Sequence, residues 1–404
     1  MFEKVHAFLA SSGVDGVKVD GQATLTMLGS DAGGSAALTR GFVHALEGSV
    51  EKHFGGAQCI NCMCHPLECF YSYQTTSVAR ASDDFWPRDP ASHTLHIANV
   101  AYTSVFLAEI VTLDWDMFQS KHPSAMLHAV ARAVGGCAVY VSDNPGNHNP
   151  EVLKRLVLPD GSVYRGLLPG RPTRDCLFVD PTRDGTSALK IWNRNRHTGL
   201  LAAFNLQSSS WDPVHRRSRL LQGRVPAVVA LLSPRDVEGF VDGPASKVDM
   251  SKVDGPASER RFVAWTTHWG QAGALIYSGA EEVRGSGQIA VRLESKEASI
   301  TTFARLRTVK RRADRAQVVW GALGLEELLN GGGSLLHVAE SPNGDAAVMR
   351  VRGAGTLLIY ATERPSRIEV GSEEAACSWD DDSKLARVAV SALEEAGCDV
   401  VLRF

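Results

Sequence analysis

The chain has 404 residues, of which 44% are hydrophobic and 22% are charged, and its formal net charge is −3. This is the composition of an ordinary globular protein, and the length predicts two or more domains. Because the charge is small and no Lys/Arg cluster stands out, we expect no electrostatic binding to nucleic acid or to a membrane surface. Apolar runs are too short to span a membrane, and Met1–His6 lacks the pattern of a signal peptide, so we expect a cytoplasmic protein.

Helical and strand patterns alternate along roughly the first 145 residues. Apolar residues recur at helical spacing in four segments, which lie before Gly13 and over 36–54, 93–111 and 122–134. Short apolar or β-branched runs predict strands over 14–19, over 59–64, before Asp83, over 113–118 and over 138–143. This alternation indicates a parallel sheet with crossover helices.

Two of these strands end in carboxylates. The first ends at Asp20, and the segment Arg80–Asp84 carries Asp83 and Asp84. In a parallel α/β barrel, side chains at the carboxyl ends of the strands converge on one catalytic rim. Two facing carboxylates are the minimum for retaining glycosyl transfer, in which one attacks the anomeric carbon and the other protonates the leaving oxygen. The alternatives to a catalytic role are that Asp20 is a solvated carboxylate at a strand end and that Asp83 and Asp84 cap the helix that follows them.

The two halves of the chain differ in pattern. Roughly five strands are too few for an eight-stranded barrel of about 250 residues, so either the sheet is open or the first strands lie upstream of Met1. Beyond Asp184, alternating runs predict an antiparallel β-sandwich. We therefore expect one domain over 1–183 and a second over 184–404. A duplicated Val-Asp-Gly-Pro-Ala-Ser segment predicts an exposed, mobile loop near 241–258.

Four of the eight cysteines lie close together, at positions 59, 62, 64 and 69. A C-x2-C pair can be half of a zinc site, but no second pair and no spaced histidines complete it. We therefore favour buried, reduced thiols over a metal site.

Several ordered motifs are similar to those of one known family. They are Lys18-Val19-Asp20, Ser82-Asp83-Asp84-Phe85-Trp86-Pro87-Arg88-Asp89-Pro90, Asp114-Trp115-Asp116-Met117-Phe118, Arg171-Pro172-Thr173-Arg174-Asp175, Lys190-Ile191-Trp192-Asn193 and Asp236-Val237-Glu238-Gly239-Phe240. In this order they resemble the plant raffinose synthase and alkaline α-galactosidase group of glycoside hydrolase family 36. The resemblance implies an α/β fold in which a partial TIM (β/α)8 barrel, with strands four to eight, precedes an antiparallel β-sandwich domain.

The resemblance also implies roles for individual residues. Asp20, at the end of the fourth barrel strand, corresponds to the nucleophile. The acid/base lies at the end of the sixth strand, where we favour Asp83; Asp84 is the alternative, and it hydrogen-bonds the galactose if it is not the acid. The galactose contacts and their neighbours on the rim are Lys18, Arg80, Trp115 and Asp116. The resemblance implies no metal and no organic cofactor.

Simple electrostatics agrees with these roles. Lys18 lies two residues before Asp20 on the same strand face and favours its anion. A second carboxylate beside the acid raises its pKa, and a retaining pair should lie about 5 to 6 Å apart. Lys18 and Arg80 could equally be structural ion-pair partners, and Trp115 could either stack on a sugar or fill the core.

The chain departs from the family pattern at three places. Gly21 stands where a larger apolar residue is expected after the nucleophile, and Cys64–Glu68 replaces a common Ser-His-Asn-Thr-Asp segment. The first three barrel strands, with the substrate contacts that they carry, precede the fourth strand in the family but not in this chain.

The expected reaction is α-galactosyl transfer with retention, from galactinol to sucrose, giving raffinose. The first alternative is an alkaline α-galactosidase that hydrolyses raffinose-family oligosaccharides, because Trp86 leads directly to Pro87 without the extra residues of some synthases. The second alternative is a truncated, inactive chain, because five strands cannot close an eight-stranded barrel and leave unpaired sheet edges. The expected partners are small galactosyl oligosaccharides, and the oligomeric state is left open.

Overall fold

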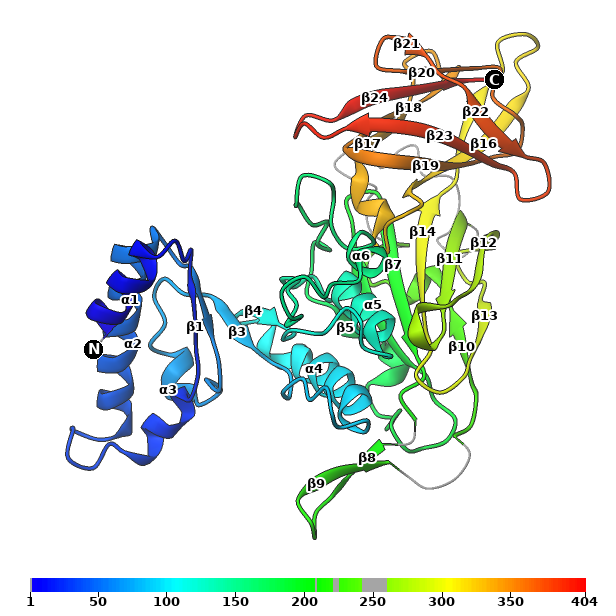
Figure 1. Cartoon of the computed structure of the whole chain (residues 1–404). Coiled ribbons are helices and arrows are strands. Elements are labelled where there is room, and N and C mark those ends of the chain that lie inside the picture. The colour runs from blue at the N-terminus through cyan, green and yellow to red at the C-terminus, as the bar shows by residue number, and fades with distance from the viewer. Residues whose placement is uncertain (1, 208, 221–224, 242–259) are drawn as a thin grey trace. The chain divides into compact units, whose positions relative to one another are not determined.

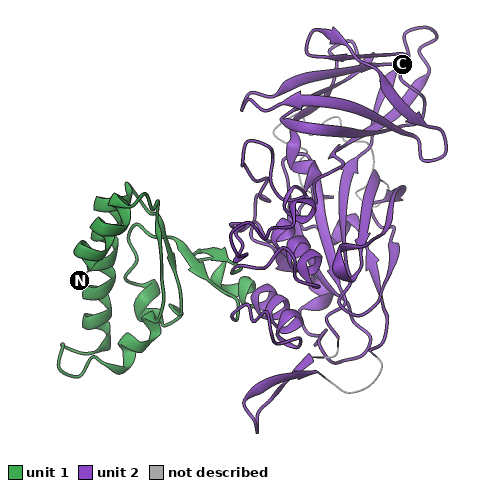
Figure 2. Cartoon of the chain, viewed as in Figure 1, with its two compact units in different colours: residues 1–83, 103–116 green, residues 84–102, 117–404 purple. Residues whose placement is uncertain are grey.

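A computed structural model describes residues 2–207, 209–220, 225–241 and 260–404 (Figure 1). They form two compact units: unit 1 holds residues 1–83 and 103–116, and unit 2 holds 84–102 and 117–404 (Figure 2). Apart from Val241, the loop predicted near 241–258 lies outside the described residues, and the domain boundary after residue 183 stays a prediction. Over the described ranges, no helix combines the length and apolar character needed to cross a membrane.

Unit 1 is built on four parallel strands that follow chain order across the sheet. They are β1 (Val17–Val19), β2 (Cys59–Asn61), β3 (Val78–Arg80) and β4 (Thr112–Asp114). The helical elements are α1 (Phe2–Ser11), η1 (Gln22–Met27), α2 (Ser35–Phe54) and α3 (Leu67–Phe70). The apolar face of α2 packs on the sheet, where Leu46 and Val50 meet Cys59. Gly55 ends α2 in a left-handed conformation, as the glycine after an apolar stripe predicts.

The predicted alternation of helix and strand in this region is confirmed, with shorter strands. The strand predicted over 59–64 ends at Asn61, because Met63 adopts a positive φ of 46°. The strand predicted over 138–143 was wrong: this segment of unit 2 makes one parallel bridge, between Phe118 and Val141. There Asp143 accepts hydrogen bonds from the backbone N–H and hydroxyl of Ser120, so side-chain bonding takes the place of a strand ladder.

The helices of unit 2 precede its sheets. They are α4 (Ser92–Leu107, whose end belongs to unit 1), α5 (Ala125–Gly135) and α6 (Pro150–Leu153). Every residue of α5 is buried, and the helix packs against strands β6, β7 and β14. A side-chain contact reinforces this packing, since Asn193 on β6 donates to the Val134 carbonyl of α5 at 2.7 Å.

Antiparallel sheets make up the rest of unit 2, as predicted. One sheet contains β12 (Leu275–Arg284), β11 (Arg261–Trp269), β14 (Ala298–Arg305), β7 (Thr198–Phe204), β6 (Leu189–Arg194) and β5 (Arg171–Pro172), in that order. Two-stranded sheets pair β10 (Val228–Leu232) with β13 (Ile289–Leu293) and β8 (Ser209–Asp212) with β9 (Arg217–Leu220). Short 3-10 turns are η2 (Arg174–Cys176), η3 (Pro234–Asp236), η5 (Gln271–Gly273) and η6 (Gly331–Ser334). The inward residues of β10 and β13 share a core with the six-stranded sheet.

Two five-stranded sheets pack together in the C-terminal part of unit 2. The first is β15 (Arg307–Lys310), β16 (Gln317–Leu325), β19 (Gly353–Ala361), β23 (Leu385–Ala392) and β22 (Cys377–Asp380). The second is β17 (Leu335–Glu340), β18 (Ala346–Val351), β24 (Cys398–Arg403), β20 (Arg367–Val370) and β21 (Glu373–Glu374). Buried side chains from both sheets, such as Trp320 and Met349, form one core.

A buried carboxylate ties the α2 helix to the loop before β3. Glu47 is 4% exposed and accepts hydrogen bonds from the backbone N–H groups of Gln74, Thr75 and Thr76 at 2.9 to 3.1 Å. The Thr76 hydroxyl donates to the same carboxylate at 2.8 Å. Asn61 in turn donates to Thr76, so the connection reaches the end of β2.

Replacing this carboxylate should destabilise unit 1. In Glu47→Gln the amide keeps the size but turns one acceptor into a donor that faces N–H groups. We expect the free energy of unfolding to fall by about 1.5 to 3 kcal/mol, the range for hydrogen bonds to a charged group. Urea unfolding followed by circular dichroism measures it, and Glu51→Gln, at an exposed position of α2, is the control. Equal midpoints for the two variants would contradict the role of Glu47.

Candidate active site

Asp20 lies one residue beyond β1, on an exposed strand end. The backbone turns at Gly21, whose φ is 74°, and the Gly21 N–H donates to the Asp20 carboxylate at 2.7 Å. The Cys62 thiol donates a second hydrogen bond. Together with the positive charges of Arg80 and Lys18, these bonds lower the pKa of Asp20 below its ordinary value. Asp20 is therefore a carboxylate at neutral pH, the form that a nucleophile requires.

The contact between Cys62 and Asp20 was not anticipated from the sequence. Val19 pairs with Asn61 in the parallel register of β1 and β2, so the residues that follow them lie side by side. Burial raises the pKa of Cys62 to about 11, which keeps the sulfur protonated and able to donate. Only the register reveals this pair, because the two residues are far apart in the chain.

Lys18, Arg80 and Asp116 come together as one ion cluster. The Lys18 Nζ lies 2.8 Å from Asp116 Oδ1, and Arg80 Nη1 lies 3.0 Å from Asp116 Oδ2. Asp116 is 2% exposed and has a left-handed φ of 63°. A non-glycine residue held in this conformation at a cluster of charges is typical of a functional site. The sequence predicted three substrate contacts here, and the structure brings these three residues together.

Asp114 supports this cluster from the end of β4. Its side chain is fully buried, with Oδ2 3.4 Å from Lys18 Nζ and Oδ1 accepting the Asp116 N–H at 3.2 Å. Asp114 therefore serves both as a cap for the turn and as a partner for Lys18. Between the two carboxylates, Trp115 is fully buried, and its predicted role in substrate binding stays a prediction.

The two candidates for the acid/base fall in different units. Asp83 is exposed at the end of the β3 segment in unit 1, and Asp84 is half-buried where unit 2 begins. The backbone after β3 is tied to β4, because the Ala81 N–H donates to the Asp114 carbonyl at 3.0 Å. The choice of Asp83 over Asp84 stays a prediction.

Buried histidines anchor the segment that follows Asp84. The Phe85 ring is 4% exposed and makes edge contacts with the rings of His93 and His128 at 5.6 and 5.0 Å. His122 Nε2 lies 3.1 Å from the Pro87 carbonyl. Burial lowers the pKa of His93 to about 3, so this ring is neutral and packs as part of the core.

The cysteines near position 60 are buried, as predicted. Those at 59, 62, 64 and 69 are all buried and unbridged. In the part of the chain that the structure describes, no group of three or more His, Cys, Asp or Glu side chains is arranged to hold a metal ion.

Comparison with known proteins identifies the family. Residues 1–390 match the family described as raffinose synthase or seed imbibition protein Sip1. The chain therefore belongs to this family, and the resemblance read from its motifs is confirmed.

Curated relatives carry related names. The chain is 41% identical over 384 residues to probable galactinol–sucrose galactosyltransferase 6 of Arabidopsis thaliana, covering 95% of this chain and 48% of the relative. It is 34% identical over 399 residues to galactinol–sucrose galactosyltransferase of Pisum sativum, covering 96% of this chain and 47% of the relative. The chain thus spans about half the length of these relatives. An α-galactosidase structure from Saccharomyces cerevisiae, solved with raffinose, matches 74% of each chain at 9% identity and a TM-score of 0.44, a likeness too low to carry an argument.

Neutralising Asp116 should disrupt the ion cluster. Asp116→Asn keeps the side-chain shape and tolerates the left-handed backbone, but it removes the charge shared by Lys18 and Arg80. Because the carboxylate is buried, we expect a loss of about 3 kcal/mol in the free energy of unfolding, measured in urea. The control Asp15→Asn, in the exposed loop before β1, should change it by less than about 0.5 kcal/mol. If both variants unfold alike, the cluster does not stabilise unit 1.

Removing the thiol donor should raise the pKa of Asp20. In Cys62→Ala the carboxylate loses the hydrogen bond that contributes most to its lowered pKa, whereas Cys62→Ser retains a donor. Carbon-13 NMR of the aspartate carboxyls measures the titration, and the resonance that is absent in Asp20→Asn identifies Asp20. We expect its pKa to rise in Cys62→Ala and to stay low in Cys62→Ser. An unchanged pKa in both would show that the thiol does not act on Asp20.

Proposed function

We propose that this chain carries the galactosyl-transferring site of a raffinose synthase, which moves α-galactose from galactinol to sucrose with retention. The observation that carries the proposal is an ionised Asp20 at the carboxyl end of a parallel strand. The charges of Lys18 and Arg80 help to keep it ionised, and Asp116 fixes the positions of both. Membership of the raffinose synthase family and the names of the relatives support the choice of sugar.

We also propose that β1 to β4 are the fourth to seventh strands of a (β/α)8 barrel. A barrel explains why the functional side chains follow the ends of the strands, since a barrel enzyme builds its site at that face.

The proposed reaction has two steps. Asp20 attacks the anomeric carbon of the galactosyl group, the bond to the leaving oxygen breaks, and Asp83 or Asp84 gives that oxygen its proton. The same carboxyl then takes the proton of a sucrose hydroxyl, whose oxygen attacks the anomeric carbon and releases Asp20. Hydrogen bonds from Gly21 and Cys62 stabilise the departing Asp20 carboxylate in this second step.

Hydrolysis is the second candidate function. Both reactions share the galactosyl-enzyme and differ in whether sucrose or water intercepts it. The direct connection from Trp86 to Pro87, typical of alkaline α-galactosidases, favours this alternative.

The test is turnover of p-nitrophenyl α-galactoside by the chain, against Asp20→Ala. We expect a loss of at least about a thousandfold in the variant, because the covalent step requires the carboxylate. The acid is identified by measuring Asp83→Asn and Asp84→Asn on substrates with a nitrophenyl and with a sugar leaving group. Loss of the acid should slow turnover more for the sugar, which is the poorer leaving group. Galactinol with sucrose then gives raffinose for a transferase or free galactose for a hydrolase. A folded chain without turnover would overturn the proposal that these residues form an enzyme.

A further inference from the structure

A polar cavity lies in unit 2, among residues that the candidate active site does not use. It has a volume of about 380 Å³ and lies beside β6 and β10, with walls from the η2 and η3 turns. Three of the motifs that carry the family resemblance meet there, around Arg174, Lys190 and Asp236. None of these three motifs lies at the strand ends of unit 1. The candidate active site therefore does not explain why they are present.

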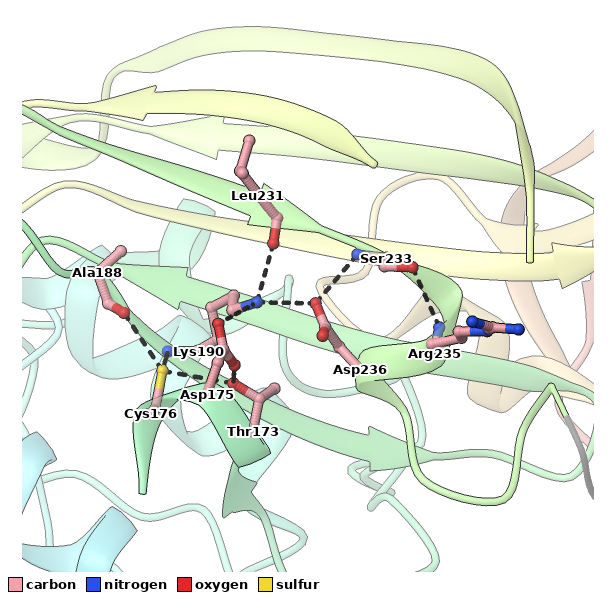
Figure 3. A network of polar contacts seen from close by, with 9 residues as sticks. All are labelled: Thr173, Asp175, Cys176, Ala188, Lys190, Leu231, Ser233, Arg235 and Asp236. Atoms are coloured by element: carbon pink, nitrogen blue, oxygen red, sulfur yellow. Dashed lines mark hydrogen bonds and ion pairs between the residues drawn. The ribbon is translucent and has the colours of Figure 1, made fainter. Parts of the chain in front are cut away.

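Lys190 lines this cavity and lies at the centre of a network of polar contacts (Figure 3). Its side chain is 7% exposed, and Nζ lies 2.9 Å from a carboxylate oxygen of Asp175, 2.9 Å from one of Asp236 and 2.9 Å from the Leu231 carbonyl. An ammonium group has three donors, so these contacts use its full capacity. Burial acts to lower the pKa of Lys190, but the two carboxylates outweigh burial and the pKa is raised.

The two carboxylates are fixed by further hydrogen bonds. The Thr173 hydroxyl donates to Asp175 at 2.6 Å, and the Ser233 N–H donates to Asp236 at 3.0 Å. Asp236 belongs to a capping box with Ser233, which fixes the η3 turn. The carboxylate oxygens are thus held in place beside the cavity. A ligand that binds them costs little side-chain conformational entropy, because these side chains are already ordered.

The lining charges of the cavity balance. Arg174, Lys190 and Arg235 contribute three positive charges, and Asp175, Asp236 and Glu238 contribute three negative charges. An anion would meet the three carboxylates, and a cation would meet the three basic groups. Hydroxyl groups both donate and accept, so they suit an alternating set of carboxylate acceptors and guanidinium donors.

The size and the rim of the cavity fit a small sugar. Its volume is at the lower end of the range for small-molecule sites, about 300 to 1,000 Å³. At the rim, Arg174 Nε lies 2.9 Å from Glu238 Oε1, and the two side chains are 83% and 42% exposed. An exposed ion pair is worth only about 0 to 1 kcal/mol, so both groups can turn to a ligand at small cost.

We propose that this cavity is a second, non-catalytic binding site for a neutral di- or trisaccharide. The proposal rests on the charge balance and geometry of the cavity and does not depend on the proposed function. A sugar held there would make charge-assisted hydrogen bonds with Arg174 and Glu238 at the rim and with the remaining acceptor positions of the Asp175 and Asp236 carboxylates.

The experiment measures binding of raffinose and sucrose to the full chain by saturation-transfer NMR and calorimetry. Every chain in the comparison carries Asp20→Ala, so that galactosyl turnover cannot consume the sugar. Arg174→Ala/Glu238→Ala should weaken binding at the cavity by about tenfold or more, the loss of one or two charge-assisted hydrogen bonds. The matched control Arg350→Ala/Asp399→Ala removes an exposed ion pair from the C-terminal sheets and should leave binding unchanged. Thermal unfolding of the two double variants should agree.

Two further measurements distinguish this proposal from the proposed function. In a background with Asp20 intact, the cavity variant should keep the p-nitrophenyl α-galactoside turnover of the parent chain. If the parent chain has no turnover, the proposed function fails, but the binding measurement still tests the cavity. Inorganic phosphate is the charged probe and should not compete with raffinose. Equal raffinose binding by the cavity and control variants, or binding of phosphate in place of the sugars, would overturn the proposal.

Discussion

Two cations from different strands converge on one buried carboxylate, and the candidate site depends on this convergence. Lys18 is on β1, Arg80 is on β3, and Asp116 follows β4, so their contact requires the carboxyl ends of these strands to face one edge of the sheet. A parallel sheet in chain order provides that arrangement. Asp116 also adopts a left-handed backbone conformation, which is uncommon for a residue other than glycine. An ion cluster and an uncommon backbone conformation thus coincide at Asp116, just beyond the end of β4.

Local patterns predicted most of the helices and the strand-end carboxylates. The apolar spacing of α2 and the glycine after it define that helix, and the run before Asp20 defines β1. These features depend on neighbours within a few residues, which sequence patterns report directly. The same reasoning failed at 138–143, where an apolar run looks like a strand but the Asp143–Ser120 hydrogen bonds determine the local structure.

Contacts between distant segments could not be predicted in the same way. The pairing of Cys62 with Asp20 follows from the register of two strands, which no local pattern specifies. Lys190 meets partners at positions 175, 231 and 236, and nothing in its own neighbourhood marks it as buried. The sequence showed its motif as part of the family resemblance. The fold brings the η2 and η3 turns beside β6, and these turns supply the carboxylates that Lys190 binds. Sequence motifs thus located the important segments, and the tertiary structure supplied their chemistry.

The protonated thiol beside Asp20 also determines how the site responds to oxidants and alkylating reagents. These reagents attack the thiolate, and with a pKa of about 11 roughly one Cys62 side chain in a thousand is ionised at pH 8. The side chain is also only 2% exposed, which limits the approach of a reagent. A hydrogen-bond donor built from sulfur would ordinarily make an active site sensitive to redox conditions. Here the thiol is buried and its pKa is raised, and both features slow its reaction with such reagents.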